Sequence, residues 1–334
     1  MNKQSFLVIA MLAACLLQGC GQDRQPESAA LGPAAAEPGP PAAEPQPAVE
    51  PQPYVVELRA VGKTFQGVGE IPSGWTTFRF VNASSMVHFA IIDVPPEGVT
   101  LQQMNDEVVQ PFQDAFDAMM AGDDEAVNAA FGRFPEWIGE LGRNGGPGFL
   151  SAGRTGQTTV YLEPGNYILE CYVKSDGVFH TTSPGEGQIG MMMELVVTEE
   201  QNGAPEPDAD LVLAIRNDGF EIVDGALQPG TNTVRVDFVE QQALPSFVGN
   251  DVHLMRVEDE RTIAAVDAWF DWRTENGLED PPPAEFLGGV NDLPAGAHGY
   301  FTVELEPGDY AFVAEVPNPL SAGFVLPVSV AGAD

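Results

Sequence analysis

The chain has 334 residues, of which 49 are acidic and 14 are basic, so its formal net charge is −35. This excess of negative charge repels phosphate backbones and argues against nucleic acid as a partner. The N-terminal 53 residues have the composition of an export signal and a spacer, and the remaining length suits one large domain or two ordinary ones.

Residues 1–20 have the pattern of an export signal: Lys3 is followed by an apolar stretch, Phe6 to Leu17, that is too short to span a bilayer. The stretch ends in Leu17-Gln18-Gly19-Cys20, which resembles the lipobox of bacterial lipoproteins. The resemblance implies lipidation of Cys20, and two or more acyl chains anchor stably at about 0.8 kcal/mol per buried CH₂. We expect a lipid-anchored protein of the cell envelope, with the periplasmic face of the outer membrane favoured over the inner membrane. An ordinary signal peptide or an uncleaved anchor is the alternative.

Residues 21–53 consist mainly of Pro, Ala, Glu and Gln. Such a segment has too few apolar side chains to offset the entropy lost on ordering, so we expect a disordered linker. Its proline content makes it semi-extended, on the order of 100 Å long in a polyproline conformation. We expect it to hold the folded part away from the membrane; a binding tail is the alternative.

The rest of the chain contains an internal repeat. Val87-His88-Phe89 corresponds to Val252-His253-Leu254, and Leu162-Glu163-Pro164-Gly165 corresponds to Leu305-Glu306-Pro307-Gly308. Alternating apolar residues flank these Pro-Gly turns, a pattern that predicts short strands and a mainly β fold made of two β-sandwiches. We place the first half at 54–199, a linker at 200–210 and the second half at 211–334.

Each half also carries a predicted helical insert. In the first, apolar residues recur at steps of three and four, with Pro111 expected to kink or restart the helix; they are Leu101, Met104, Val108, Phe112, Phe116 and Met119. Asp123 and Asp124 are expected to cap a second short helix. In the second half, a helix with Val266 and Trp269 on its apolar face is expected to end near Gly277.

The chain has three cysteines. Cys15 lies in the predicted export signal and Cys20 is the predicted lipidation site, so Cys171 is the one cysteine of the predicted folded part. An exported protein meets an oxidising environment, where an unpaired thiol favours either metal ligation or full burial. His88 precedes Cys171 along the chain, and His180 and a run of three methionines that begins at Met191 follow it. A small buried apolar side chain is the alternative reading of Cys171.

In these residues the first half resembles the cupredoxin-like domains of plastocyanin and azurin, which are Greek-key β-sandwiches. The resemblance extends over 54–199 and, more weakly, over 211–330. It implies a type 1 copper site in which His88, Cys171 and His180 are equatorial ligands and Met191 is the axial ligand, with Met192 or Met193 as substitutes. Two imidazoles and a thiolate in a plane, with a weak axial thioether, suit both oxidation states of copper.

The sequence departs from the cupredoxin pattern in two ways. Eight residues separate Cys171 from His180 and ten more precede Met191, whereas cupredoxins usually have only a few at each place. In the second half, Ala314 stands where the cysteine would fall, and no histidine follows it. We therefore expect the second half to be degenerate and metal-free, with His253 serving folding or hydrogen bonding.

These features predict a membrane-anchored periplasmic copper-binding protein that transfers electrons or carries copper, with a redox protein as partner. A metal-free cupredoxin-like interaction or scaffold lipoprotein is the alternative. We do not expect an enzyme, because a two-domain copper oxidase or nitrite reductase needs a second, histidine-rich copper centre. The chain contains four histidines, too few to supply both centres comfortably.

Overall fold

The computed structural model describes residues 52–244 and 246–332. The predictions for the export signal, for lipidation at Cys20 and for all but the end of the 21–53 linker lie outside the described residues. The described residues all belong to one compact unit, Glu50–Asp334. Within them, no helix combines the length and the apolar character needed to cross a membrane.

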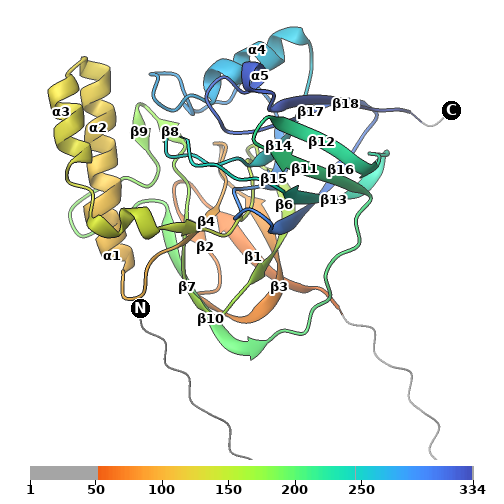
Figure 1. Ribbon diagram of the computed structural model, residues 1–334, viewed down its shortest axis with the longest axis horizontal. Helices are drawn as coiled ribbons and strands as arrows, with labels where there is room; N and C mark the ends of the chain where they lie inside the picture. The colour runs from red at the N-terminus through yellow and green to blue at the C-terminus, as the bar shows by residue number, and fades with distance from the viewer. Residues whose placement is uncertain (1–51, 245, 333–334) are drawn as a thin grey trace, which may run out of the picture. The chain divides into compact units, whose positions relative to one another are not determined.

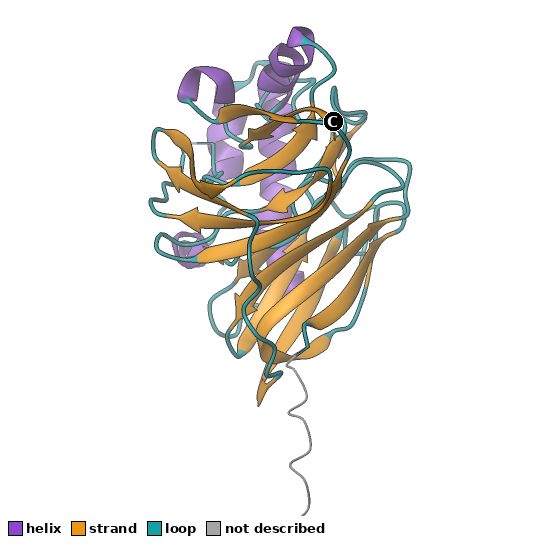
Figure 2. Ribbon diagram, turned by 90° about the vertical axis from the view of Figure 1, so that its right-hand side faces the viewer, coloured by secondary structure: helices purple, strands orange, loops and turns teal. Residues whose placement is uncertain are grey.

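Strands dominate both halves of the chain (Figures 1 and 2), so the predicted mainly β fold is confirmed. The strands of the first half are β1 (Tyr54–Ala60), β2 (Phe65–Gln66), β3 (Glu70–Asn82), β4 (Ile91–Val94), β5 (Gly142–Arg143), β6 (Thr155–Leu162), β7 (Gly165–Glu170), β8 (Lys174–Ser175), β9 (Val178–Phe179) and β10 (Met192–Gln201). Those of the second half are β11 (Leu211–Arg216), β12 (Gly219–Gly225), β13 (Gly230–Phe238), β14 (Val252–Arg256), β15 (Phe286–Val290), β16 (His298–Leu305), β17 (Gly308–Val313) and β18 (Val325–Val330).

Strand pairing repeats between the halves. In the first, β1 runs parallel to β3, and β7 pairs antiparallel with both β4 and β10. In the second, β11 runs parallel to β13, and β17 pairs antiparallel with both β14 and β18. The alternating burial of these strands directs apolar side chains into one large core cluster that includes residues of both halves.

A single strand, β3, belongs to both sheets of the first half. Its beginning pairs with β10 from Glu70 to Ser73, and its remainder pairs with β6 from Gly74 onward. Gly74 has a φ of 117°, a conformation that residues with a Cβ rarely adopt. The glycine therefore allows the strand to pass from one sheet to the other.

The two halves are joined by strand pairing. β6 of the first half pairs antiparallel with β16 of the second, with Thr158 opposite Phe301. The sheets of the two halves thus form one continuous arrangement, β12-β11-β13-β16-β6-β3-β10-β7-β4-β5, beside a separate sheet β15-β14-β17-β18. A shared sheet of this kind holds the halves at a fixed relation within the described unit.

The helical inserts are present. The helices of the first half are α1 (Leu101–Met104), the π-helical turn η1 (Asn105–Val109), α2 (Gln110–Ala121), α3 (Asp124–Phe131) and the 3-10 turn η2 (Glu136–Glu140); those of the second are α4 (Glu260–Trp269) and α5 (Pro319–Ala322). Pro111 lies in the first turn of α2, directly after the π turn, so the helix restarts there as expected. Asp123 caps α3 by accepting from the Ala126 N–H. The prediction for α4 was too long, because the helix ends at Trp269 rather than near Gly277.

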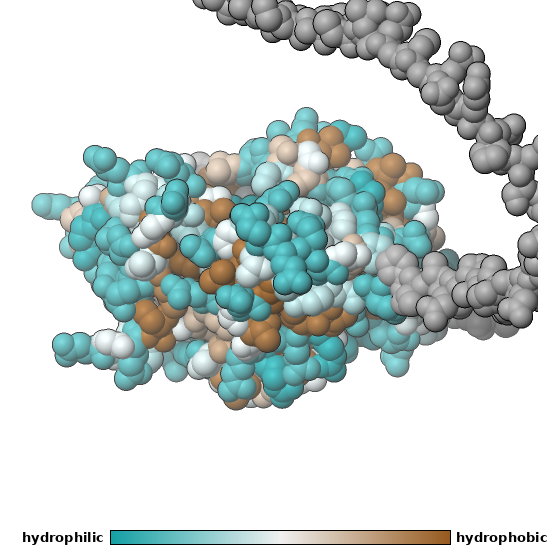
Figure 3. Space-filling model, turned by 90° about the horizontal axis from the view of Figure 1, so that it is seen from below, coloured by the Kyte–Doolittle hydropathy of each residue, from teal (hydrophilic) through white to brown (hydrophobic). Residues whose placement is uncertain are grey.

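Figure 1 shows α2 and α3 side by side at one edge of the sheets, with α4 and α5 at another. Figure 3 shows apolar side chains scattered among polar ones on one face of the molecule. Single exposed apolar residues of this kind are normal on protein surfaces and need no special account.

Candidate metal centre

Three segments of the first half bring His88, Cys171 and His180 together. His88 lies between β3 and β4, where two backbone hydrogen bonds to Leu150, of 3.2 and 2.8 Å, hold it in place. Cys171 follows directly after β7, and His180 directly after β9. All three are buried, with exposed fractions of 0, 0 and 2 %.

The distances among these side chains fit a shared metal ion. The Cys171 Sγ lies 3.5 Å from the Nδ1 of His88 and 3.9 Å from the Nδ1 of His180. Metal bonds of roughly 2.3 Å to sulfur and 2.0 Å to nitrogen, set 120° apart, would separate the sulfur and nitrogen atoms by about 3.7 Å. The two observed distances bracket that value, so the sulfur and both Nδ1 atoms can face one centre.

A small hairpin resolves the long spacing between Cys171 and His180. β8 and β9 pair with each other, with Lys174 opposite Phe179, and the His180 N–H donates to the Val173 carbonyl at 2.8 Å. The hairpin therefore begins after Val173, and its end at His180 returns to Val173. The extra residues lie outside the ligand positions and do not displace His180 from Cys171.

A second loop, 183–190, accounts for the spacing before Met191. Its two ends meet because the Met191 N–H donates to the His180 carbonyl at 2.7 Å. Gly190 makes this closure possible, since a Cβ at that position would lie 2.0 Å from the Thr181 carbonyl oxygen. Ser183 ties the loop internally, because its hydroxyl lies within hydrogen-bond distance of the carbonyls of Gly185 and Gln188.

Met191 is fully buried and lies beside both neighbouring ligands. Its carbonyl accepts from the Cys171 N–H at 3.2 Å, and its N–H is the one bonded to His180. Met192 and Met193 instead enter β10, opposite Glu170 and Leu169. The donor set, two imidazoles and a thiol with a buried methionine adjacent, resembles that of a type 1 copper site.

Burial sets the protonation of the site. It lowers the pKa of His88 to about 4 and lowers the pKa of His180 to about 2. Burial also raises the pKa of the Cys171 thiol to about 12. At neutral pH both imidazoles are therefore neutral, and the thiol holds the one proton that a metal ion must displace.

Ser175 orients His180, a role that the sequence did not indicate. Its Oγ lies 2.8 Å from His180 Nε2, and the same hydroxyl contacts the sulfur of Met86 at 3.5 Å. When the ring donates through Nε2, the Nδ1 lone pair is left facing Cys171. Ser175 stands in the short strand β8, which the sequence presents only as part of an enlarged polar loop.

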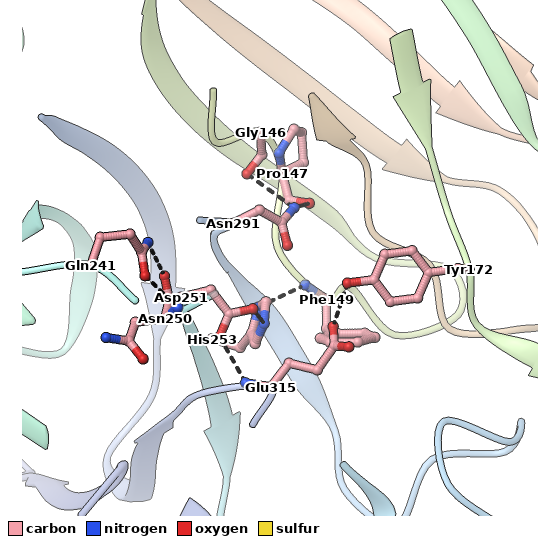
Figure 4. Close-up of polar contacts among 10 residues, drawn as sticks. All are labelled: Gly146, Pro147, Phe149, Tyr172, Gln241, Asn250, Asp251, His253, Asn291 and Glu315. Carbon is pink, nitrogen blue, oxygen red and sulfur yellow. Dashed lines mark hydrogen bonds and ion pairs between the residues drawn. The ribbon is translucent and has the colours of Figure 1, made fainter. Parts of the chain in front are cut away.

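The second half has a cluster at the equivalent place, Asp251, His253 and Glu315, but it is arranged differently (Figure 4). His253 Nδ1 accepts from the Phe149 N–H at 3.1 Å, so Nε2 carries the proton and donates to Asp251 Oδ2 at 2.7 Å. Asp251 also accepts from the Glu315 N–H at 2.7 Å. Both ring nitrogens are thus engaged, and the imidazole has no free lone pair for a metal ion.

Comparisons with known proteins find similarity among solved structures. No protein-family model and no curated protein matches the chain. Among solved structures, the chain is similar to reduced auracyanin from Roseiflexus castenholzii, at 17 % identity and a TM-score of 0.28, over 36 % of this chain and 95 % of that one. It is also similar to auracyanin A, a "blue" copper protein from Chloroflexus aurantiacus, at 20 % identity and a TM-score of 0.25, over 44 % of this chain and 99 % of that one.

A third similar structure matches most of the chain. The copper nitrite reductase from Nitrosomonas europaea aligns with 84 % of this chain and 95 % of its own, at 12 % identity and a TM-score of 0.21. TM-scores this low show nothing about the activity of this chain. The assignment of the metal centre therefore rests on the convergence of His88, Cys171 and His180.

Proposed function

We propose that the protein is a copper-binding electron carrier whose single copper site lies in the first half. The observation that carries this proposal is the convergence of the Cys171 sulfur and two Nδ1 atoms at distances of 3.5 and 3.9 Å. His88, Cys171 and His180 would hold the metal in a plane, and Met191 remains the predicted axial ligand. Copper in such a site accepts and releases one electron.

Burial favours electron transfer over copper delivery. The three ligand side chains are at most 2 % exposed, and the loops around them are closed by backbone hydrogen bonds. A copper carrier has to release its metal to a partner, whereas an electron carrier benefits from ligands that hold their places in both oxidation states. The closed geometry supports the second role.

We also propose a carrier rather than an enzyme. Of the four histidines, two belong to the candidate site and His253 has both nitrogens engaged. The fourth, His298, bonds to Glu206 at 2.8 Å in a partly exposed position. This chain therefore has no further histidines from which to build a second copper centre.

We also propose a membrane anchor and a redox protein as partner. These two parts of the proposal rest on the sequence alone. Lipidation at Cys20 would tether the carrier to the periplasmic face of the outer membrane, with residues 21–53 as its spacer. The test is radiolabelled palmitate fed to expressing cells. Incorporation that is lost with Cys20→Ser supports the anchor, and absence of label in the unaltered protein contradicts it.

The copper proposal is tested by adding Cu(II) to the chain with Cys15→Ser and Cys20→Ser, so that Cys171 is its sole thiol. We expect one equivalent of bound copper and an intense visible thiolate-to-copper absorption. The further change Cys171→Ser should remove that absorption while thermal unfolding shows a folded protein. Bound copper without a thiolate band would contradict the site, and failure to retain copper would favour a metal-free scaffold.

A further inference from the structure

A cavity of about 450 Å³ lies between the helical insert of the first half and residues 241–244 and 246–249 of the second. Its volume falls within the range of pockets that hold small organic ligands. The lining is rich in aromatic side chains from both halves; they are Phe112, Phe134, Tyr172, Phe179, Phe247 and Trp272. Aromatic walls of this kind favour flat apolar rings, which can meet them edge to face or stacked.

Polar groups also line this cavity. Arg143, Glu170 and Asp292 line the cavity, and Arg143 Nη1 contacts Asp93 Oδ1 at 2.5 Å. A guanidinium carries five N–H donors, so this pairing leaves others available. Ser246 also lines the cavity and is 2 % exposed. Its Oγ has no hydrogen-bond partner within the described part of the chain.

The local charge restricts the head group of a ligand. Three carboxyl groups, those of Asp93, Glu170 and Asp292, interact with the single guanidinium of Arg143. Burial raises the pKa of Asp292 only to about 6, so its carboxylate is ionised at neutral pH and would repel an anionic head group beside it. A neutral hydroxyl suits this part of the wall better, because it can donate to the Asp292 carboxylate and accept from Arg143.

We propose that this cavity is a binding site for a neutral molecule of the phenol class, with an aromatic body against the rings and a hydroxyl directed to Arg143 and Asp292. The site does not depend on copper. Its position is nevertheless informative, because Glu170, Tyr172 and Thr181 line the cavity and each is the chain neighbour of Cys171 or His180. A bound molecule would thus contact residues that are next in the chain to Cys171 and His180.

The test measures binding of 2-naphthol, naphthalene and 2-naphthoate to the metal-free full chain by equilibrium dialysis. We expect saturable binding of one 2-naphthol per chain, at least tenfold tighter than that of naphthalene or 2-naphthoate. The Cys171→Ser variant should bind 2-naphthol equally well, which separates failure of this site from failure of the copper proposal. Absence of saturable binding, or 2-naphthoate binding as tightly as 2-naphthol, would overturn the inference.

Two variants locate the site. Gly139 lies at the exposed edge of the cavity, and a Cβ there would meet no atom within 4 Å. Gly139→Trp should weaken 2-naphthol binding at least tenfold, whereas Gly139→Ala, the matched control, should change it less than twofold. Asp292→Asn should reduce the preference for 2-naphthol over naphthalene several-fold. Equal binding by both Gly139 variants, together with an unchanged preference in Asp292→Asn, would rule out this cavity.

Discussion

The two halves of the molecule keep a histidine at the same place in the repeat but use it differently. In the first half, the Nδ1 atom of His88 faces a thiol across 3.5 Å. In the second half, the Nδ1 atom of His253 accepts from a backbone N–H, and Nε2 is bonded to Asp251. A histidine can serve as a metal ligand only when a lone pair is free, so the hydrogen bonds of each ring decide its role.

The largest difference between the halves should appear in copper affinity. His88→Ala removes an equatorial ligand, and we expect copper affinity to fall by more than about 100-fold. The loss of a residue that only hydrogen-bonds to a metal ligand typically costs about 10–100-fold, and the loss of a ligand should cost more. His253→Ala should leave copper affinity within about twofold. Competition with a copper chelator measures both values, and similar losses in the two variants would abolish the distinction between the clusters.

For the stability of the metal-free protein we expect the opposite order, with His253→Ala losing more than His88→Ala. His253→Ala leaves the buried Phe149 N–H and the Oδ2 atom of Asp251 without their partner, and we expect a loss of about 2–4 kcal/mol in the free energy of unfolding. Metal-free His88→Ala should lose less, because the ring bonds mainly to the thiol. Urea unfolding of the metal-free proteins measures this. A larger loss for His88→Ala would show that its ring is structural.

The repeat, the mainly β class and the helical inserts could be predicted from the sequence because each rests on local patterns. Pro164 directly precedes β7 and its counterpart Pro307 directly precedes β17, and the glycine after each proline is the first residue of the strand. The end of α4 was misjudged because Gly277 lies beyond it, in a turn closed by a bond from the Gly277 N–H to the Thr274 carbonyl. A glycine marks a turn without showing which residue ends the preceding helix.

The convergence of His88, Cys171 and His180 could only be suggested from the sequence. The order of the residues indicated the site, but the spacing argued against it. Whether a long insertion displaces a ligand depends on where its ends meet, and backbone bonds such as His180 N–H to Val173 carbonyl are not visible in the sequence. The role of Ser175 and the pairing of β6 with β16 likewise depend on contacts between distant residues.

A substitution in the 183–190 loop should have a smaller effect and should act on the first half alone. Gly190→Ala places a Cβ against the Thr181 carbonyl oxygen, where the distance would be 2.0 Å. We expect a loss of about 1–3 kcal/mol in stability from the forced backbone shift and a roughly tenfold weaker copper affinity, because the shift moves His180. Gly185→Ala, in the same loop, has its nearest contact at 3.4 Å and is the matched control. Equal effects of the two changes would contradict the account of this loop.

The pH dependence of copper binding separates this buried site from an exposed one. Between about pH 5 and 9 both imidazoles are already neutral, with pKa values near 4 and 2, and the thiol, with a pKa near 12, still holds its proton. One proton is then released per copper, so affinity should rise about tenfold per pH unit. Exposed histidines of pKa near 6.5 would make the dependence steeper below that pH. Calorimetry in two buffers counts the protons, and a count near three at pH 5 would contradict the account.

The central claim is that one sulfur and two imidazole nitrogens of the first half bind the same copper ion. X-ray absorption at the copper edge measures this directly on the protein with one equivalent of copper. We predict one sulfur at roughly 2.2–2.3 Å and two nitrogens at roughly 2.0 Å, as expected for thiolate and imidazole bonds. A copper environment of nitrogen and oxygen without any sulfur neighbour would contradict the claim.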